Sequence, residues 1–235
     1  NPKLAGRDLG ELLKLPAPLG VKVTDRPREL LAELKADVVI HTAGSRIKSI
    51  YQQFEEILDS RINIVSSSEE LLFPSTDNSA LAERIHLLAT EKRVTVLGTG
   101  VNPGFVMDAL PLFLTGVCQD VREIHVQRIV DAATRRYPLQ KKIGAGLTVR
   151  EFKDLVKAGT IRHVGLTESI GMIAAGLGWE LDKLTETIEP IVAKRTVKSQ
   201  YLTVKAGQAA GVRQVGRGYR DGREVITLEF EACLG

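Results

Sequence analysis

Two adjacent carboxylates, Glu69 and Glu70, end a run of small polar residues in the segment SSSEE. A carboxylate held partly out of water can accept or donate a proton, so this pair is a candidate for acid–base chemistry. Adjacent side chains face different ways, and at most one of the two is expected to point into a site. The alternative is structural, because acidic residues also favour a helix N-terminus through its dipole. The residues alone do not separate the two interpretations.

Two other polar loops occupy the same kind of position along the chain. HTAGS follows the apolar run ADVVI, GTGVNPG follows RVTVL, and SSSEE itself follows INIV. The carboxyl ends of parallel strands line the crevice where ligands bind in a wound sheet. Three such loops in series therefore predict one shared site, although they do not fix its chemistry.

The glycine-rich loop GTGVNPG does not match a dinucleotide phosphate cradle. That motif has the spacing G-x-G-x-x-G after the first strand of the sheet. Here Gly98 and Gly100 have the expected spacing, but Gly104 comes one residue too late. The loop also follows a later strand of the series, not the first. Pro103 also lacks one of the amides that a helix start would offer to a phosphate. We interpret Asn102 as the N-cap of the next helix and Pro103 as its first residue.

Hydrophobic periodicity divides the chain into two halves. In the first half, strands expected in 20–25, 36–44, 62–68 and 93–98 alternate with helices expected in 26–35, 46–60 and 78–92. The continuous apolar run in 36–44 is typical of a strand buried within a parallel sheet. After Cys118 we expect a strand in 121–133, helices in 147–159 and 167–178, and antiparallel strands in 186–234. Thr148 and Glu151 form a capping-box pattern, and Asp221-Gly222 predicts a hairpin turn.

These patterns predict an α/β protein of two domains. Residues 1–118 would form a Rossmann-type doubly wound parallel sheet whose first strand is missing, and residues 119–235 an α+β domain. The composition, with 43% hydrophobic and 26% charged residues, is that of an ordinary globular protein. A net charge of +3 without a basic, aromatic-rich stripe argues against nucleic acid. With two widely separated cysteines and no membrane-length apolar run, we expect a cytoplasmic protein without a metal site.

Six longer segments together resemble one known family. They are NPKLAGRDLGELL, ADVVIHTAGS, IVSSSEELLFP, GTGVNPGFVMD, RIVDAATRRYPLQKKIGAGLT and RHVGLTESIGMIAAGLGW. The family is that of 2,4-diaminopentanoate dehydrogenase and the native amine dehydrogenases, which are similar in fold to dihydrodipicolinate reductase. The resemblance implies a homodimeric enzyme that uses NAD or NADP, with a second domain for substrate binding and dimerisation. It also implies a strand and a GxGxxG turn before Asn1 and further elements after Gly235, so we expect the chain to be incomplete.

The resemblance further implies oxidative deamination of an amine or diamino acid, or in reverse the reductive amination of a ketone with ammonia. The catalytic carboxylate of the family is expected in SSSEE, as Glu70 by preference or as Glu69. Thr42, Gly44 and Ser45 would then approach the ribose and phosphate of the cofactor. The remaining cofactor-binding candidates are Ser67, Gly98, Thr99, Asn102 and Pro103.

Three residues of the second half are candidates for substrate binding. Arg135 and Arg136 could bind a carboxylate with two parallel hydrogen bonds, although a surface or dimer-interface salt bridge accounts for them equally well. His163 is a candidate polar group in the pocket, or else a helix-start residue. Of the other basic groups, Lys141 or Lys142 could contact a phosphate or be solvated, and His41 is interpreted as a hydrogen-bonded core histidine.

Two alternative functions stay open. A reductase of a cyclic imine such as dihydrodipicolinate would share the fold, but it would need a basic cluster for a dicarboxylate, and the Glu69-Glu70 pair suits a cationic amine better. A non-catalytic nucleotide-binding or scaffold protein would explain the missing phosphate cradle. It would not explain why the SSSEE and GTGVNPG loops are intact.

Overall fold

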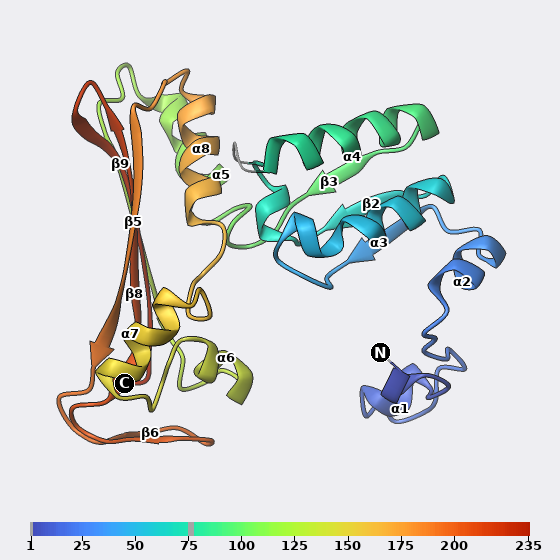
Figure 1. The fold of residues 1–235 in the computed structure, drawn as a ribbon, viewed down its shortest axis with the longest axis horizontal. Helices are drawn as coiled ribbons and strands as arrows, with labels where there is room; N and C mark the ends of the chain where they lie inside the picture. The colour runs from blue at the N-terminus through green and yellow to red at the C-terminus, as the bar shows by residue number, and fades with distance from the viewer. Residues whose placement is uncertain (1, 75–77) are drawn as a thin grey trace.

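The computed structural model describes residues 2–74 and 78–235, which form two lobes, with the segment around α1 standing apart from the sheets (Figure 1). The elements of the first lobe are η1 (Pro2–Leu4), α1 (Leu9–Leu12), α2 (Pro27–Glu33), β1 (Val38–His41), α3 (Ile47–Asp59), β2 (Asn63–Ser66), η2 (Glu69–Leu71), α4 (Ser79–Lys92) and β3 (Val96–Gly98). The remaining elements are α5 (Ala109–Leu114), η4 (Thr115–Val117), β4 (Ile124–Asp131), α6 (Tyr137–Lys142), α7 (Val149–Lys157), α8 (Leu166–Gly176), β5 (Lys183–Val192), β6 (Val197–Lys198), β7 (Thr203–Val204), β8 (Ala209–Arg220) and β9 (Arg223–Cys233). No helix in the described ranges has the length and apolar character needed to cross a membrane.

The first lobe contains the predicted parallel sheet. Its three strands lie in the order β1-β2-β3, so that Ile40 pairs with Val65 and Val65 with Leu97. Helix α3 forms because its apolar residues recur at helical spacing, and Phe54 on that face is fully buried. Helices α3 and α4 pack against each other and against the sheet. The predicted strand–helix alternation is therefore confirmed from residue 27 to residue 98.

One face of this sheet is not covered by the described residues. Ile40 is 67% exposed and Leu97 is 52% exposed, and both point away from the core that α3 and α4 build. The expectation that 36–44 is a fully buried strand is therefore wrong. Both crossover connections run over the same side of the sheet, because the three strands lie in sequence order and such connections are right-handed.

The strand predicted in 20–25 is also wrong. This segment makes only an isolated antiparallel bridge between Lys22 and Asp8. Its backbone hydrogen bonds go to the loop around α1, where Val23 accepts from Gly6 and Val21 accepts from Leu9. The pairing covers too few residues to build a strand, and the segment joins neither sheet.

The second lobe is a four-stranded sheet in the order β4-β9-β8-β5. The β5–β8 and β8–β9 pairs are antiparallel as predicted, and β4 pairs with β9 in parallel. Asp221 and Gly222 both have positive φ and form the predicted hairpin turn. The Thr148–Glu151 capping box is present at the start of α7. Helices α7 and α8 lie on the side of the sheet that faces the first lobe, and Figure 1 shows no described helix on the other side.

The segment that joins the lobes differs from its prediction. Residues 101–108 form turns that include a cis Asn102–Pro103 peptide, and the helix begins only at Ala109 with Asp108 as its N-cap. The interpretation of Asn102 as N-cap and Pro103 as first helical residue is therefore wrong. Asp108 takes that role because its carboxylate reaches the amide of Ala109 at 2.6 Å. Helix α5 then packs on α8, within the second lobe.

Candidate functional site

Several polar groups at the carboxyl edge of the parallel sheet bind one another. His41 Nδ1 lies 3.0 Å from Ser66 Oγ, and its Nε2 lies 3.1 Å from Gln53 Oε1. The Ser68 hydroxyl donates to the backbone oxygen of Ser45 at 3.1 Å. The interpretation of His41 as a hydrogen-bonded core histidine is confirmed. These bonds fix the loop after β1 against the loop after β2.

The two adjacent carboxylates have different surroundings. Glu70 Oε2 accepts from the amide of Ile47 at 2.9 Å, so Glu70 satisfies one of the free amides at the start of α3. The Glu69 carboxylate, which is half-buried, makes no hydrogen bond or ion pair with any described residue. Both belong to η2, at the same end of the sheet as the exposed residues Thr42, Ser67 and Thr99.

The GTGVNPG loop carries an unusual asparagine. Neither the nitrogen nor the oxygen of the Asn102 side-chain amide has a partner among the described residues, and both are buried. Nearby Asp108 is the opposite case: fully buried, it accepts from the amides of Gly104 at 2.8 Å and Ala109 at 2.6 Å, and from Ser169 Oγ at 2.6 Å. The bond to Ser169 ties the loop to α8. A buried amide without partners is rare in a native structure, and strain, a functional role or a bound water or ion usually accounts for one.

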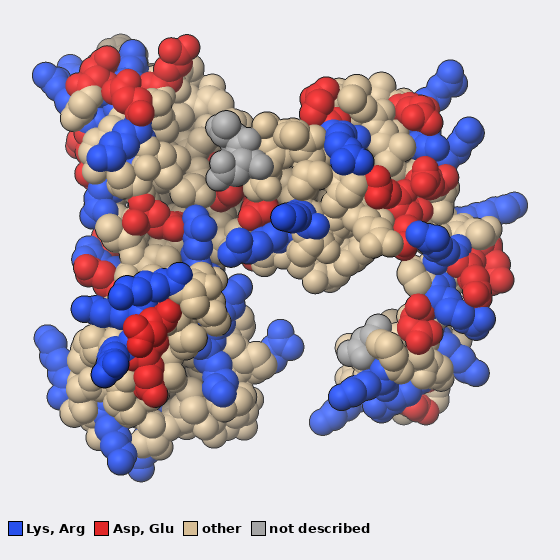
Figure 2. All heavy atoms as spheres, in the orientation of Figure 1, with Lys and Arg blue, Asp and Glu red and all other residues tan. Residues whose placement is uncertain are grey.

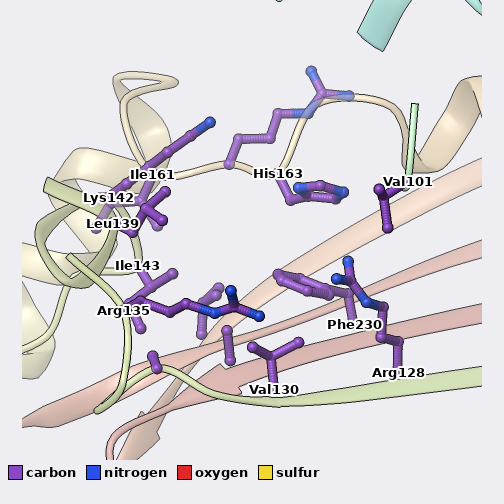
Figure 3. A pocket seen from close by; sticks show the side chains of 14 residues that line it. Val101, Arg128, Val130, Arg135, Leu139, Lys142, Ile143, Ile161, His163 and Phe230 are labelled. Carbon is purple, nitrogen blue, oxygen red and sulfur yellow. The ribbon is translucent and has the colours of Figure 1, made fainter. Parts of the chain in front are cut away.

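A cavity of about 380 Å³ lies over the four-stranded sheet, next to this loop (Figure 3). Val101 lines it from the GTGVNPG loop, and the other lining residues come from the second lobe. Apolar side chains such as Val130, Ile143 and Phe230 form its floor and wall. The basic lining residues are Arg128, Arg135, Lys142, Arg162 and His163, and no Asp or Glu is among the described residues that line it.

His163 is a neutral polar group in this cavity. Burial, together with the charges of Lys142 and Arg128, lowers its pKa to about 4. The ring stacks on Phe230 with centroids 4.6 Å apart, and its buried Nε2 has no described partner. Gln214 fixes the backbone at this point, since its oxygen accepts from the amide of His163 and its nitrogen donates to the carbonyl, both at 2.8 Å.

Comparison with known proteins identifies the second lobe. Residues 105–233 match the model of the 2,4-diaminopentanoate dehydrogenase C-terminal domain. The chain belongs to this family. It is 39% identical over 203 residues to the 2,4-diaminopentanoate dehydrogenase of Acetoanaerobium sticklandii, covering 86% of this chain and 58% of that protein. It is 30% identical over 237 aligned residues to an amine dehydrogenase of Streptomyces virginiae, covering 97% of this chain and 65% of that protein.

The chain thus spans less than two thirds of the length of these two relatives. A solved structure of the amine dehydrogenase from Mycobacterium smegmatis superposes with a TM-score of 0.86 over 100% of this chain and 70% of that one, at 22% identity. That likeness shows the fold. The predicted family, the α/β fold class, the Rossmann-type parallel sheet and the α+β second half are all confirmed. The predicted boundary at residue 118 stays a prediction.

The structure brings together only part of the predicted site of this dehydrogenase family. Arg135 and His163 line the cavity, whereas Arg136 stands exposed before α6 and does not line it. Arg128 was missed by the sequence reasoning. The sequence contained a signal for it. The inward face of β4 carries the apolar residues Ile124, Val126 and Val130, and Arg128 is a charged residue on the same face.

Proposed function

We propose that the chain takes part in NAD(P)-dependent oxidative deamination of an amine or diamino acid, or in reverse the reductive amination of a ketone with ammonia. One observation carries the proposal: the buried, unpartnered amide of Asn102 lies next in sequence to Val101, which lines the cavity. The unpartnered amide of Asn102 and a residue that lines the cavity therefore belong to one loop, GTGVNPG. Membership of the 2,4-diaminopentanoate dehydrogenase family supports the reaction class.

The described residues fit a nicotinamide cofactor at this edge. The Asn102 side chain offers a donor group and an acceptor group, which are the complement of a primary carboxamide. Bound there, NAD or NADP would accept the hydride from the amine-bearing carbon. The residues that would hold it are Thr42, Gly44, Ser45, Ser67, Gly98, Thr99, Asn102 and Pro103.

One of the two carboxylates would hold the substrate ammonium and take its proton. Glu69 is favoured for this role because its carboxylate is half-buried and not bound to a described residue, whereas Glu70 is engaged at the start of α3. Glu70 remains the alternative, since a single hydrogen bond leaves a carboxylate with free acceptor positions. A carboxylate in that place would also activate the water that attacks the iminium carbon.

The second lobe would bind the rest of the substrate. Arg135 and His163 line the cavity and are proposed to contact it, and Arg136 would act only after a movement of its loop. The open face of the four-stranded sheet, where Ile129 is 64% exposed, supports a homodimer. We place the protein in the cytoplasm, in keeping with the free thiols of Cys118 and Cys233.

A second candidate is the reductase of a cyclic imine such as dihydrodipicolinate. The observation that favours it is the basic lining of the cavity, where Arg128, Arg135 and Lys142 could bind a dicarboxylate. The carboxylate of Glu69, which has no partner among the described residues, favours a cationic amine instead.

The test follows the formation of reduced cofactor at alkaline pH, with NAD and with NADP, on matched pairs of amines and alcohols. Turnover of an amine without turnover of its alcohol is the expected result. Cofactor binding without turnover of any amine, together with reduction of a cyclic imine, would move the assignment to the second candidate.

A further inference from the structure

The cavity residues Arg162 and His163 lie in a loop that is supported by the four-stranded sheet. The loop joins α7 to α8, and a Cβ on Gly165 at its end would lie 2.4 Å from Pro103 Cγ, so this end packs tightly on Pro103. Nearer its middle, both backbone groups of His163 bind the side chain of Gln214. One side chain of β8 therefore supplies the pair of hydrogen bonds that a neighbouring antiparallel strand would supply.

The neighbours of Gln214 fix the orientation of its amide. Gln214 is fully buried, and its Nε2 donates to the carbonyl of His163 and to Glu186 Oε1, both at 2.8 Å. Its Oε1 accepts from the amide of His163 at 2.8 Å. Exchanging the nitrogen and the oxygen would place donor against donor and acceptor against acceptor. The carboxylate of Glu186 thus keeps Gln214 in the orientation that the backbone of His163 requires.

Glu186 also contacts the loop directly, through Arg162. Its Oε2 lies 2.8 Å from Arg162 Nε. In the sheet Glu186 is paired with Gly216, which has no side chain, so Glu186 can reach Gln214 diagonally. Burial raises the pKa of the Glu186 carboxyl, whereas the charge of Arg162 and the hydrogen bond from Gln214 favour the charged form. Two adjacent loop residues are therefore linked to each other through side chains of β5 and β8.

The ring of His163 depends on this support for its place in the cavity. It stacks on Phe230 with centroids 4.6 Å apart, and Figure 3 shows it opposite that residue. Its buried Nε2 has no partner among the described residues. Burial lowers its pKa, and so do the charges of Lys142 on α6 and Arg128 on β4. Because stacking alone lets a ring slide over its partner, the position of the backbone decides where Nε2 lies.

We propose that Gln214 and Glu186 are positioning residues, which hold the loop so that His163 Nε2 has a fixed place in the cavity and binds an uncharged polar group of the substrate there. Neither residue is among the described residues that line the cavity, so both act through Arg162 and His163. The proposal rests on the proposed function, since the bound molecule is taken to be the amine substrate.

The titration of the His163 ring tests the proposal without turnover. In protein with isotope-labelled histidine, the His163 ring signal in the NMR spectrum is the one lost in His163→Phe. Between about pH 5 and 7 it should not move in the parent, because the pKa lies at about 4. Gln214→Met keeps the length of the side chain but releases the backbone, so the ring should gain water and titrate in this range. An unmoved signal in the folded variant would overturn the proposal.

Gln208→Met is the matched control. Gln208 makes the same pair of bonds with loop backbone, since it donates to the carbonyl of Gly146 and accepts from the amide of Lys205, both at 2.8 Å. It lies outside the set of described residues that line the cavity. The variant should lower the urea midpoint while His163 keeps its signal. A titration equal to that of Gln214→Met would show that general loosening is the cause, and would contradict the assignment to Gln214.

A shorter amide provides a second variant if Gln214→Met fails to fold. Gln214→Asn keeps both polar groups, but its side chain is one carbon too short to reach both backbone groups of His163. It should show the same titration of the ring between about pH 5 and 7. A folded Gln214→Asn variant with the parent's signal would overturn the proposal as well.

Kinetics on 2,4-diaminopentanoate separate a positioning role from a purely structural one. Gln214→Met should raise KM about three- to tenfold, as for the loss of one neutral hydrogen bond, and leave kcat within about twofold of the parent. Glu186→Gln can still accept from Gln214 through its amide oxygen, so it should raise KM less. A lower urea midpoint with an unchanged KM in both variants would assign the two residues to stability alone.

The two assays together distinguish this proposal from the proposed function. If the His163 signal titrates in Gln214→Met but the parent oxidises no amine, the positioning stands and the deamination fails. If the parent oxidises 2,4-diaminopentanoate and Gln214→Met changes neither KM nor the signal, the deamination stands and the positioning fails.

Discussion

His41 and His163 show how differently the two lobes treat their polar groups. Both ring nitrogens of His41 are hydrogen-bonded at the edge of the parallel sheet, whereas the buried Nε2 of His163 has no described partner at the cavity. The contrast recurs within the first lobe and at the junction. Among the described residues, Glu70 accepts from an amide and the Glu69 carboxylate has no partner, while Asp108 accepts three hydrogen bonds and the Asn102 side chain makes none. Satisfied groups shape the edge, and we propose that the unsatisfied ones mark where another molecule completes the bonding.

The largest effect, on kcat, is expected for the adjacent carboxylates Glu69 and Glu70. Glu69→Gln removes the charge and should lower kcat on an amine by about 10²–10⁴-fold, the usual range for loss of a general base. Glu70→Gln keeps an oxygen that can accept from the amide of Ile47, so kcat and stability should stay close to those of the parent. Steady-state kinetics and cofactor titration measure both variants. The reverse pattern, with loss only in Glu70→Gln, would show that the bound carboxylate is the base.

The cavity histidine should make stability depend on pH. The pKa of His163 lies at about 4 in the folded protein against an ordinary value of 6.5, so between these values the unfolded chain holds more protons. Stability is therefore retained above pH 6.5 and lost as the pH falls towards 4, by up to about 3 kcal/mol. Urea unfolding at several pH values measures the loss. His163→Phe keeps the stacking on Phe230 and should flatten the curve in this window; a curve of unchanged slope would remove His163 as its cause.

At the junction between the lobes, a substitution of Asp108 should lower the stability of the fold, whereas a substitution of Asn102 should weaken cofactor binding. Asp108→Asn places an amide nitrogen among three donors and should cost about 1–3 kcal/mol of unfolding free energy. Asn102→Ala removes two unpartnered atoms, so it should leave the urea midpoint nearly unchanged and weaken cofactor binding instead. Fluorescence titration with NADH and NADPH measures the second effect. A loss of stability in Asn102→Ala without a loss of cofactor affinity would contradict the assignment.

Sequence periodicity predicted the regular elements well because burial enforces it. Phe54 and its neighbours form the buried face of α3, and Thr148 caps α7 as expected. The site was harder to predict, because a loop sequence does not reveal which of its polar groups the rest of the chain supplies with hydrogen bonds. Glu70 and Glu69 differ only in that an amide of α3 reaches one of them. The helix after GTGVNPG also begins later than expected. Asp108 is its N-cap, and the carboxylate of Asp108 is bound by Ser169, which is distant in sequence and so contributes to no local pattern.

The order of strands in the second lobe has a consequence for how the chain acquires its structure. Among the described strands, β4 pairs only with β9, so the pairing of Ile124 requires Ile226 to be present. Pairings between residues so distant in sequence form slowly, since a long loop must close before any contact is gained. On a ribosome, β5 and β8 can pair as soon as both have emerged, while the pairing of β4 requires β9 to be made. The inward face that carries Arg128 is therefore completed only after β9 has been made.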